Sequence, residues 1–280
     1  MDRIIATPSY TKEILEKHQM YAKKNYGQNF LVEPQIVEKI AVESLLSENS
    51  TALEIGPGIG ALTQFLAIHA KKVIAFEIDD RLLPVLDDTL APYNNVEIIH
   101  QDFLQADLAK ILADESEVVV AANLPYYITT PILFKLFESD VKIKKITVMM
   151  QKEVADRFSA KVNTKDYNAL SIVSQYNYDV QTILKISKHV FNPKPNVDSA
   201  VVQFTYRPSK LVDNEEAFFE LVKACFKQRR KTILNNLGEY LQDKEKAKVA
   251  LEAANLDSKR RAESMEATEF ARLYEVLHDH

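Results

Sequence analysis

The strongest indication of the fold of this chain is the segment Glu54-Ile55-Gly56-Pro57-Gly58-Ile59-Gly60. The chain has only 5 glycines, and three of them fall in this window. Glycine is used where φ must be positive or where a ligand approaches the backbone closely. A β-rich run (residues 50–53) precedes the window, and an amphipathic helical pattern (residues 62–66) follows it. A strand, a glycine loop and a helix in this order predict a site for a nucleotide-type ligand.

The spacing of the glycines narrows the choice of ligand. It is G-x-G-x-G rather than the G-x-G-x-x-G of dinucleotide sites, and Pro57 removes one backbone N–H group that a pyrophosphate would use. A cofactor with a nucleoside but no phosphate fits better, and S-adenosylmethionine is the common one. The histidines and the single cysteine form no cluster with ligand spacing, so we expect no metal.

Acidic and amide residues follow the next three predicted strands. Residues 73–76 end at Glu77, residues 96–100 are followed by Asp102, and residues 118–122 end at Asn123. Ligands of open α/β sheets bind beyond the carboxyl ends of the strands, where an acid can accept from ribose hydroxyls. Each acid alone is more simply a solvated loop carboxylate. Their joint order along the chain favours a cofactor site.

The tetrapeptide Asn123-Leu124-Pro125-Tyr126 predicts a pocket for a planar base. The Asn123 side-chain oxygen and the Leu124 or Pro125 carbonyl can accept the two hydrogens of an exocyclic amine, while the Tyr126 ring stacks on the base. The alternative is an ordinary turn, since Asn and Pro are frequent turn residues. The neighbouring cofactor motifs favour the base pocket.

Composition limits the class of protein. The chain has 280 residues, of which 46% are hydrophobic and 27% charged, as in a globular protein with one large and one smaller domain. The lone cysteine, Cys225, suggests a reducing cytoplasm, and its amphipathic surroundings predict a core-facing thiol. Residues 1–30 lack the long apolar run of a signal peptide or membrane span, so we expect no membrane partner.

The net charge of −5 hides two blocks of opposite sign. Residues 50–120 contain 12 acids and 4 bases, a net charge of −8, whereas residues 140–210 contain 6 acids and 12 bases, a net charge of +6. A basic face can bind phosphates even when the total charge is negative. A solvated basic surface is the alternative, and the size of the separation favours a polyanionic partner.

The pattern along the chain predicts two domains. Strands alternate with helical patterns from 51 to about 150, which indicates a parallel sheet. Residues 181–186 and 200–206 predict two more strands, paired antiparallel, and residues from about 214 onward are helical throughout. A boundary near 208 gives a catalytic domain, residues 1–208, and a helical RNA-binding domain, residues 209–280.

The ordered motifs resemble the KsgA-type family of small-subunit ribosomal RNA adenine N6-dimethyltransferases. The resemblance runs from Lys23 to about Leu237 and includes residues 27–31, 151–155, 191–199 and 226–231. It implies a Rossmann-like class I S-adenosylmethionine-dependent methyltransferase sheet (α/β) with a small C-terminal all-helical domain. It also implies N6,N6-dimethylation of two adjacent adenosines in the 3′-terminal hairpin of 16S rRNA, with the small ribosomal subunit as partner. We expect a cytoplasmic monomer.

The resemblance also implies residue roles. The residues that would contact S-adenosylmethionine are Asn29, Leu31, Gly56, Gly58, Glu77, Asp102 and Asn123, and those that would hold the target adenine are Asn123, Leu124, Pro125, Tyr126 and Phe191. Judged alone, Asn29 and Leu31 form an ordinary loop before a helix, and Phe191 is as well explained as a core anchor. Two positions depart from the family: Tyr127 stands where a smaller polar residue is common, and Asn168 stands where glycine is common, so we expect a positive φ at Asn168.

A cationic segment predicts contact with the RNA backbone. On a continuous helix, Lys223, Lys227, Arg230 and Lys231 share one face, while Phe226, Ile233 and Leu237 share another. A solvated helix face is the alternative. The candidate RNA-binding residues are Lys223, Lys227, Arg229, Arg230 and Lys231.

Two other functions compete with small-subunit dimethylation. One is a related methyltransferase that modifies large-subunit RNA and confers antibiotic resistance. The other is a mainly non-catalytic assembly factor that binds immature small subunits. Leu124, the acidic overall balance and residues 226–231 favour the small-subunit enzyme over the first. The complete set of catalytic motifs disfavours the second.

Overall fold

The computed structural model of the chain describes residues 3–20 and 29–278. Gly27 and Gln28, which contribute to the family resemblance, lie outside the described residues. The chain divides into two compact units: Met1–Ala155 with Gln181–Tyr206, here called the sheet unit, and Asp156–Val180 with Arg207–His280, the helical unit. One crossing between the units lies at Tyr206–Arg207, beside the boundary that the sequence predicts. The membership of residues 156–180 in the helical unit was not expected.

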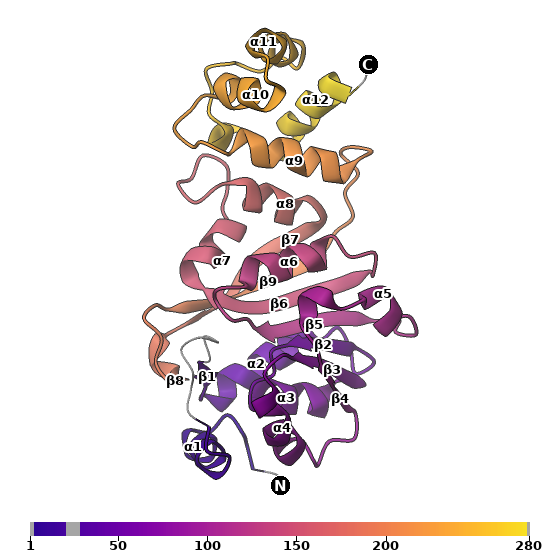
Figure 1. Cartoon of the computed structure of the whole chain (residues 1–280), viewed down its shortest axis with the longest axis vertical. Helices are drawn as coiled ribbons and strands as arrows, with labels where there is room; N and C mark the ends of the chain where they lie inside the picture. The colour runs from indigo at the N-terminus through magenta and orange to yellow at the C-terminus, as the bar shows by residue number, and fades with distance from the viewer. Residues whose placement is uncertain (1–2, 21–28, 279–280) are drawn as a thin grey trace. The chain divides into compact units, whose positions relative to one another are not determined.

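A seven-stranded sheet forms the centre of the sheet unit, in the order β4-β3-β2-β5-β6-β9-β7 (Figure 1). The strands from β4 to β6 are parallel, and β9 runs antiparallel to β6. All residues of β2 are buried, as expected of a central parallel strand covered on both faces. The predicted parallel α/β sheet is therefore present. Its strands are β2 (Thr51–Ile55), β3 (Lys72–Glu77), β4 (Val96–His100), β5 (Val118–Asn123), β6 (Ile143–Gln151), β7 (Tyr178–Ile186) and β9 (Ser199–Tyr206).

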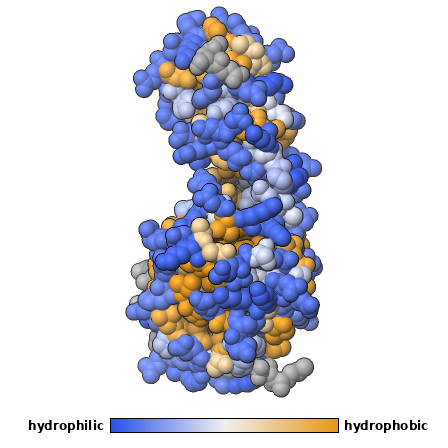
Figure 2. Space-filling model, turned by 90° about the vertical axis from the view of Figure 1, so that its right-hand side faces the viewer, coloured by the Kyte–Doolittle hydropathy of each residue, from blue (hydrophilic) through white to orange (hydrophobic). Residues whose placement is uncertain are grey.

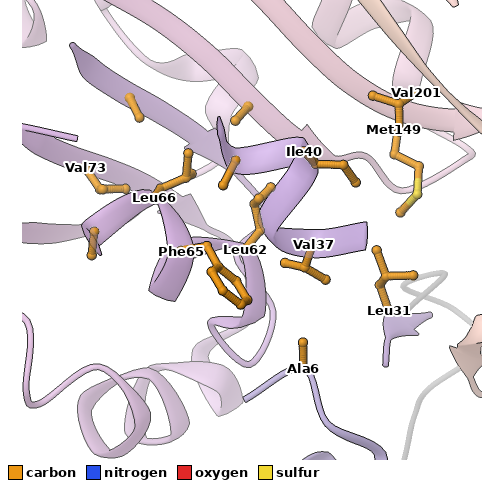
Figure 3. Packing of buried hydrophobic residues seen from close by; sticks show 14 of the residues in the cluster. Ala6, Leu31, Val37, Ile40, Leu62, Phe65, Leu66, Val73, Met149 and Val201 are labelled. Carbon is orange, nitrogen blue, oxygen red and sulfur yellow. The ribbon is translucent and has the colours of Figure 1, made fainter. Parts of the chain in front are cut away.

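Helices α2 (Pro34–Ser44) and α3 (Ala61–His69) pack on each other and on the sheet. Proline at the first position of α2 suits a helix start, because that N–H group has no intrahelical partner. Apolar residues of both helices meet strand residues in one buried cluster, in which Met149 and Leu31 point toward one another (Figure 3). The other helices of this unit are α1 (Pro8–Lys17), α4 (Leu83–Thr89), α5 (Leu108–Ile111) and α6 (Thr129–Phe137).

A two-stranded sheet joins two segments that are far apart in the sequence. Strand β1 (Phe30–Leu31) pairs antiparallel with β8 (Phe191–Asn192), so that Leu31 lies opposite Phe191. The sequence predicted loops at both places. Because β1 directly follows Asn29, this pairing fixes the candidate cofactor segment against the proline-containing loop.

The helical unit has its own aromatic core. Helix α8 (Ala169–Asn177) contributes Tyr176, whose ring lies 5.5 Å from that of Phe218 in α9 (Glu215–Cys225). The Cys225 thiol is fully buried, which confirms the predicted core-facing thiol. The remaining helices are α10 (Ile233–Leu241), α11 (Lys244–Ala253) and α12 (Ala267–His278), while α7 (Lys152–Phe158) spans the first crossing between the units.

Two local predictions were wrong. Asn168 does not have a positive φ: it is extended (φ −159°) and caps α8, with its side-chain oxygen accepting from Leu170 N at 2.8 Å. Asparagine is a preferred N-cap residue, which explains its presence without any glycine-like conformation. Helix α9 is also not continuous through the cationic segment, because it ends at Cys225 and α10 begins at Ile233.

The surface of the sheet unit mixes hydrophilic side chains with hydrophobic areas (Figure 2). Ile78 and Tyr127 are large apolar residues that are 55% and 63% exposed, and both belong to loops that follow strands. Within residues 3–20 and 29–278, no helix has the length and apolar character needed to cross a membrane.

Candidate active site at the carboxyl ends of the strands

A cavity lies beyond the carboxyl ends of β2, β3 and β5, and encloses about 1310 Å³ of empty space, counting the part open to solvent. The tertiary structure thus brings together segments from residue 29 to residue 149. The cavity is lined by every residue predicted to contact the cofactor or the base except Phe191, namely Asn29, Leu31, Gly56, Gly58, Glu77, Asp102, Asn123, Leu124, Pro125 and Tyr126.

The glycine loop has the backbone conformation that its sequence predicts. Gly56, Gly58 and Gly60 have φ values of 72°, 61° and 88°. A Cβ atom at Gly60 would lie 3.0 Å from Leu90, so this position is crowded as well as left-handed. At Gly56 the nearest atom to such a Cβ would be Pro125 Cδ, at 4.0 Å. The loop and the 123–126 turn therefore face each other across the space that a Gly56 side chain would enter.

Glu77 is a buried carboxylate held by backbone donors. Its Oε1 accepts from Ile78 N at 2.9 Å and Asp79 N at 2.8 Å, and its Oε2 accepts from Gly58 N at 3.4 Å. Burial raises its pKa, and the three N–H groups act in the opposite direction. The same bonds connect the end of β3 to the glycine loop, so the acid is fixed in orientation toward the cavity.

Asp102 and Asn29 each take part in a hydrogen bond that holds them at the cavity. Asp102 Oδ1 accepts from Leu104 N at 2.9 Å and caps a short 3₁₀ helix, Phe103–Gln105. The Asn29 carbonyl accepts from the Asn123 amide nitrogen at 3.3 Å. Because the Asn123 nitrogen donates to the protein, its side-chain oxygen is the acceptor atom of the amide, as a role toward an exocyclic amine requires.

Hydrogen bonds within the 123–126 turn indicate which carbonyl, that of Leu124 or that of Pro125, can accept the second hydrogen of an exocyclic amine. The Pro125 oxygen already accepts from Ile128 N and from Thr129 Oγ1, both at 3.1 Å. A carbonyl has two lone pairs, so these two bonds occupy it. The Leu124 carbonyl is therefore the better second acceptor, and Leu124 is held in place by its own N–H bond to Met149 O at 3.2 Å.

The aromatic candidates differ in position. Tyr126 lines the cavity, and its hydroxyl lies 2.8 Å from Ser199 Oγ. Tyr127 also lines the cavity and is 63% exposed. Phe191 is 5% exposed, and it packs in the same core cluster as Leu31 and Met149. In this structure Phe191 thus occupies the core position that its sequence context alone suggested.

Glu54 is a cavity residue that the sequence analysis did not single out. It is 1% exposed, lines the cavity, and its Oε2 has no hydrogen-bond partner among the described residues. Burial raises its pKa to about 8. The available signal was an acid two residues before Gly56, inside an otherwise apolar strand.

The donor set fits S-adenosylmethionine. The acids that line the cavity are Glu54, Glu77, Asp79 and Asp102, and none of the described residues that line it is a lysine or an arginine. Such a lining suits a ligand with cationic groups and disfavours a pyrophosphate. The unpartnered Glu54 oxygen and the open space at Gly56 are the features that a cationic nucleoside cofactor would fill. Across the described residues, no group of three or more His, Cys, Asp or Glu is arranged to hold a metal ion.

Four of the five predicted RNA-binding residues lie in a bend between α9 and α10, namely Lys227, Arg229, Arg230 and Lys231, whereas Lys223 lies in the last turn of α9. Lys227 and Lys231 contact Glu239 at 2.8 and 3.3 Å, and Arg229 contacts Glu263 at 3.1 Å. The buried Asn236 side chain donates to two carbonyls of this region, Cys225 O and Gln228 O. Ile233 and Leu237 are fully buried, as predicted. The cations are therefore exposed on a bend that the protein itself holds in shape.

Comparison with known proteins gives one consistent family. A profile of the family described as "Ribosomal RNA adenine dimethylase" matches residues 19–279. The "Ribosomal RNA small subunit methyltransferase A" of Bacillus pumilus (strain SAFR-032) is 52% identical over 287 residues, covering 99% of this chain and 98% of the relative. The protein of the same name from Anoxybacillus flavithermus (strain DSM 21510 / WK1) is 52% identical over 288 residues, with the same coverage.

Solved structures show the same fold. A dimethyladenosine transferase from Plasmodium falciparum has a TM-score of 0.73 and 28% identity, covering 86% of this chain and 94% of that one. The 23S rRNA methyltransferase ErmE has a TM-score of 0.67 and 28% identity, covering 89% of this chain and 99% of that one. The predicted Rossmann-like methyltransferase fold with a helical C-terminal region is confirmed.

Proposed function

Since the chain belongs to the ribosomal RNA adenine dimethylase family, we propose that it transfers methyl groups from S-adenosylmethionine to adenosine N6 in small-subunit ribosomal RNA, giving N6,N6-dimethyladenosine. The observation that carries the proposal is the shared cavity: the amide of Asn123 and the acids Glu77 and Asp102 line one space. Cofactor and target base would therefore meet in that space.

The cofactor half of the cavity is assigned by chemistry. Glu77 would accept from the ribose hydroxyls, and Asp102 from the adenine amine of the cofactor. Gly56 and Gly58 would allow close approach of the backbone, and the segment at Asn29 and Leu31 would close the site beside Asn123. When bound, S-adenosylmethionine supplies a methyl group activated by its sulfonium.

The Asn123 oxygen and the Leu124 carbonyl would accept the two N6 hydrogens of the target adenine. The lone pair of this nitrogen is delocalised into the ring, so a pyramidal nitrogen is needed for attack. Two acceptors favour that geometry, which resembles the transition state more than the ground state. Alignment of this kind can lower a barrier by up to about 7–11 kcal/mol. No dedicated general base is required, because the methylated nitrogen is acidic enough to lose its proton to water.

The target base must leave its stack to enter the cavity. Extrusion costs a few kcal/mol and is easiest for a base in a loop. The Tyr126 ring would stack on the base, an interaction that contributes about 1–3 kcal/mol. Phe191 is buried and does not line the cavity, so its ring would have to move to stack on the other face of the base. We therefore assign the stacking role to Tyr126 alone.

The substrate and its recognition follow from the family and from the charge pattern. We propose the small ribosomal subunit as the partner, with two adjacent adenosines of its 3′-terminal RNA hairpin as targets, and the cytoplasm as the place of action. The cations at 223–231 would contact the RNA backbone. We further propose that the protein acts as a monomer, with residues 1–208 supplying the catalytic site and residues 209–280 forming an RNA-binding domain.

Two competing functions are less well supported. The large-subunit enzyme ErmE is 28% identical, whereas the small-subunit relatives are 52% identical over almost the whole chain. A purely non-catalytic assembly factor would not need Asn123, Glu77 and Asp102 in one cavity. A role in small-subunit assembly beside catalysis is compatible with the same basic surface.

The test is transfer of labelled methyl groups to unmethylated small subunits, large subunits and DNA, followed by nucleoside analysis. We expect N6,N6-dimethyladenosine in small-subunit RNA alone. Asn123→Ala should lower kcat at least about 100-fold, since one of the two acceptors and the alignment are lost. The control is Asn95→Ala, which removes a half-buried amide directly before β4 that does not line the cavity and that donates to Ala67 O and Ala70 O. Label in large-subunit RNA would support the resistance-type enzyme, and binding without any transfer would support the assembly factor.

A further inference from the structure

A hydrogen bond behind the candidate base pocket connects two segments 73 residues apart. The Tyr126 hydroxyl lies 2.8 Å from Ser199 Oγ. Tyr126 lines the cavity, whereas Ser199 does not, and Ser199 is fully buried. The tyrosine hydroxyl is thus engaged inside the protein. It follows that Tyr126 presents its ring, rather than its hydroxyl, to a ligand in the cavity.

Ser199 is held on both sides by backbone structure. It is the first residue of β9 and pairs in register with Gln151, the last residue of β6. The preceding residue, Asp198, accepts from Lys152 N through its carbonyl at 3.0 Å and from Lys188 N through Oδ1 at 2.9 Å. The serine hydroxyl is therefore a fixed point, set by the sheet and by the loop that leads into it.

A hydrogen bond at the para position controls the ring more strongly than a contact near the backbone would. A tyrosine side chain turns about two torsions, and both are restrained when its outer end is bonded to a fixed partner. Burial of the Tyr126 phenol raises its pKa, which favours the protonated form that this hydrogen bond uses.

We propose that Ser199 is a positioning residue for the methyl transfer, acting by fixing the tilt of the Tyr126 ring against the target adenine. This inference rests on the proposed function, because it assumes that the base stacks on Tyr126. The 193–199 loop would then do more than pack against the sheet, because it places the Ser199 hydroxyl beside the Tyr126 hydroxyl.

The test is a double-mutant cycle with Ser199→Ala, Tyr126→Phe and the double variant. Each single change removes the same hydrogen bond and keeps the ring, so we expect each to lower kcat for small-subunit RNA by about five- to tenfold. The double variant should be no slower than the single variants. The dissociation constant of S-adenosylmethionine, measured by calorimetry, should not change. Ser44→Ala is the matched control, since it removes another fully buried serine hydroxyl, which donates to Ile40 O within α2.

The outcomes separate this inference from the proposed function. If the wild-type protein methylates adenine N6 but Ser199→Ala is as fast as Ser44→Ala, the positioning role is overturned. Multiplying losses in the double variant, or a matching loss of cofactor affinity and of melting temperature, would also overturn it in favour of a structural role. If the wild-type protein transfers no methyl group to adenine, the proposed function itself fails.

Discussion

Glu54 is an acid that the fold buries in the wall of the cavity. Glu54 lies in the middle of the sheet, on β2, and one of its oxygens has no partner among the described residues. Thr63, from α3, is equally buried, and its interaction with the Glu54 carboxyl partly offsets the rise in pKa that burial causes. A charged carboxylate that is buried without a partner is costly, which is why burial raises the pKa of Glu54.

The pH dependence of stability should report this residue. The pKa of Glu54 is raised from 4.5 to about 8, so between these pH values the folded protein keeps a proton that the unfolded chain has lost. The Glu54 contribution therefore makes the protein less stable as pH rises through this window. Glu54→Gln stays neutral throughout, and its unfolding free energy relative to wild type should rise by up to roughly 3–5 kcal/mol between pH 5 and pH 9.

Urea unfolding at pH 5, 7 and 9, without cofactor, measures the effect of this substitution. The control is Glu38→Gln at an exposed position of α2, which should follow the wild-type pH curve. If the stability of Glu54→Gln stays at a constant offset from wild type, Glu54 is not protonated in the folded state.

At the scale of elements, the bend between α9 and α10 combines cations with their own acidic partners. Glu239, in the second half of α10, accepts from both Lys227 and Lys231 and also from Gln228. These exposed ion pairs contribute little to stability. They hold the lysine side chains in one region, and an approaching phosphate would have to compete with Glu239 for them.

If this bend binds RNA phosphates, the salt dependence of the binding constant should report the number of cations that make the contact. Arg230 is exposed, and Arg230→Gln should weaken binding to small-subunit RNA about equally for all sequences and reduce the slope of log K against log salt by about 1. Filter binding at several salt concentrations gives the slope. Lys248→Gln, at an exposed position of α11, is the control for loss of one positive charge elsewhere in the helical unit. An equal change in both variants would mean that only total charge matters.

Elements were predicted well where the signal is local. The sheet strands and the glycine loop follow from apolar runs and from glycines whose positive φ values the structure shows. The end of α9 was missed because the sequence of residues 223–231 keeps a helical period. The chain leaves the helix there, and the Asn236 side chain from α10 donates to the carbonyls of Cys225 and Gln228. The short pairing of β1 with β8 was missed for a different reason: strands of two residues are too short to show a periodic pattern in the sequence.

At the scale of the whole molecule, each unit is built from separate pieces of chain. Residues 156–180 leave the sheet unit after β6 and pack with the C-terminal helices. Tyr167 donates to Met265 O at 3.0 Å, and Asn163 N donates to Glu263 O at 2.9 Å. The Tyr176 ring packs on Phe218 and Phe219. The helical unit therefore completes a core to which the 156–180 segment belongs.

A chain cut after residue 208 should show this dependence. The truncation removes α9 and α12, so Tyr176 would lose its aromatic partners and Tyr167 its carbonyl acceptor. We expect a lower melting temperature and increased binding of a hydrophobic dye. A chain that lacks only residues 279–280 is the control. If the cut protein melts like the full chain, the 156–180 segment is stable without the helices, and 208 is a true domain boundary.

Features that depend on neighbouring residues could be predicted from the sequence. These are the parallel sheet, the glycine loop, the acids and amide at successive strand ends, and the family. Packing between distant segments decides which groups share a partner: the Pro125 carbonyl is occupied, Phe191 is in the core, and Tyr126 is bonded to Ser199. The two kinds of feature differ in the distance along the chain between the residues that interact. Backbone conformation and periodicity depend on adjacent residues, whereas burial and hydrogen-bond partners depend on packing between segments far apart in the chain.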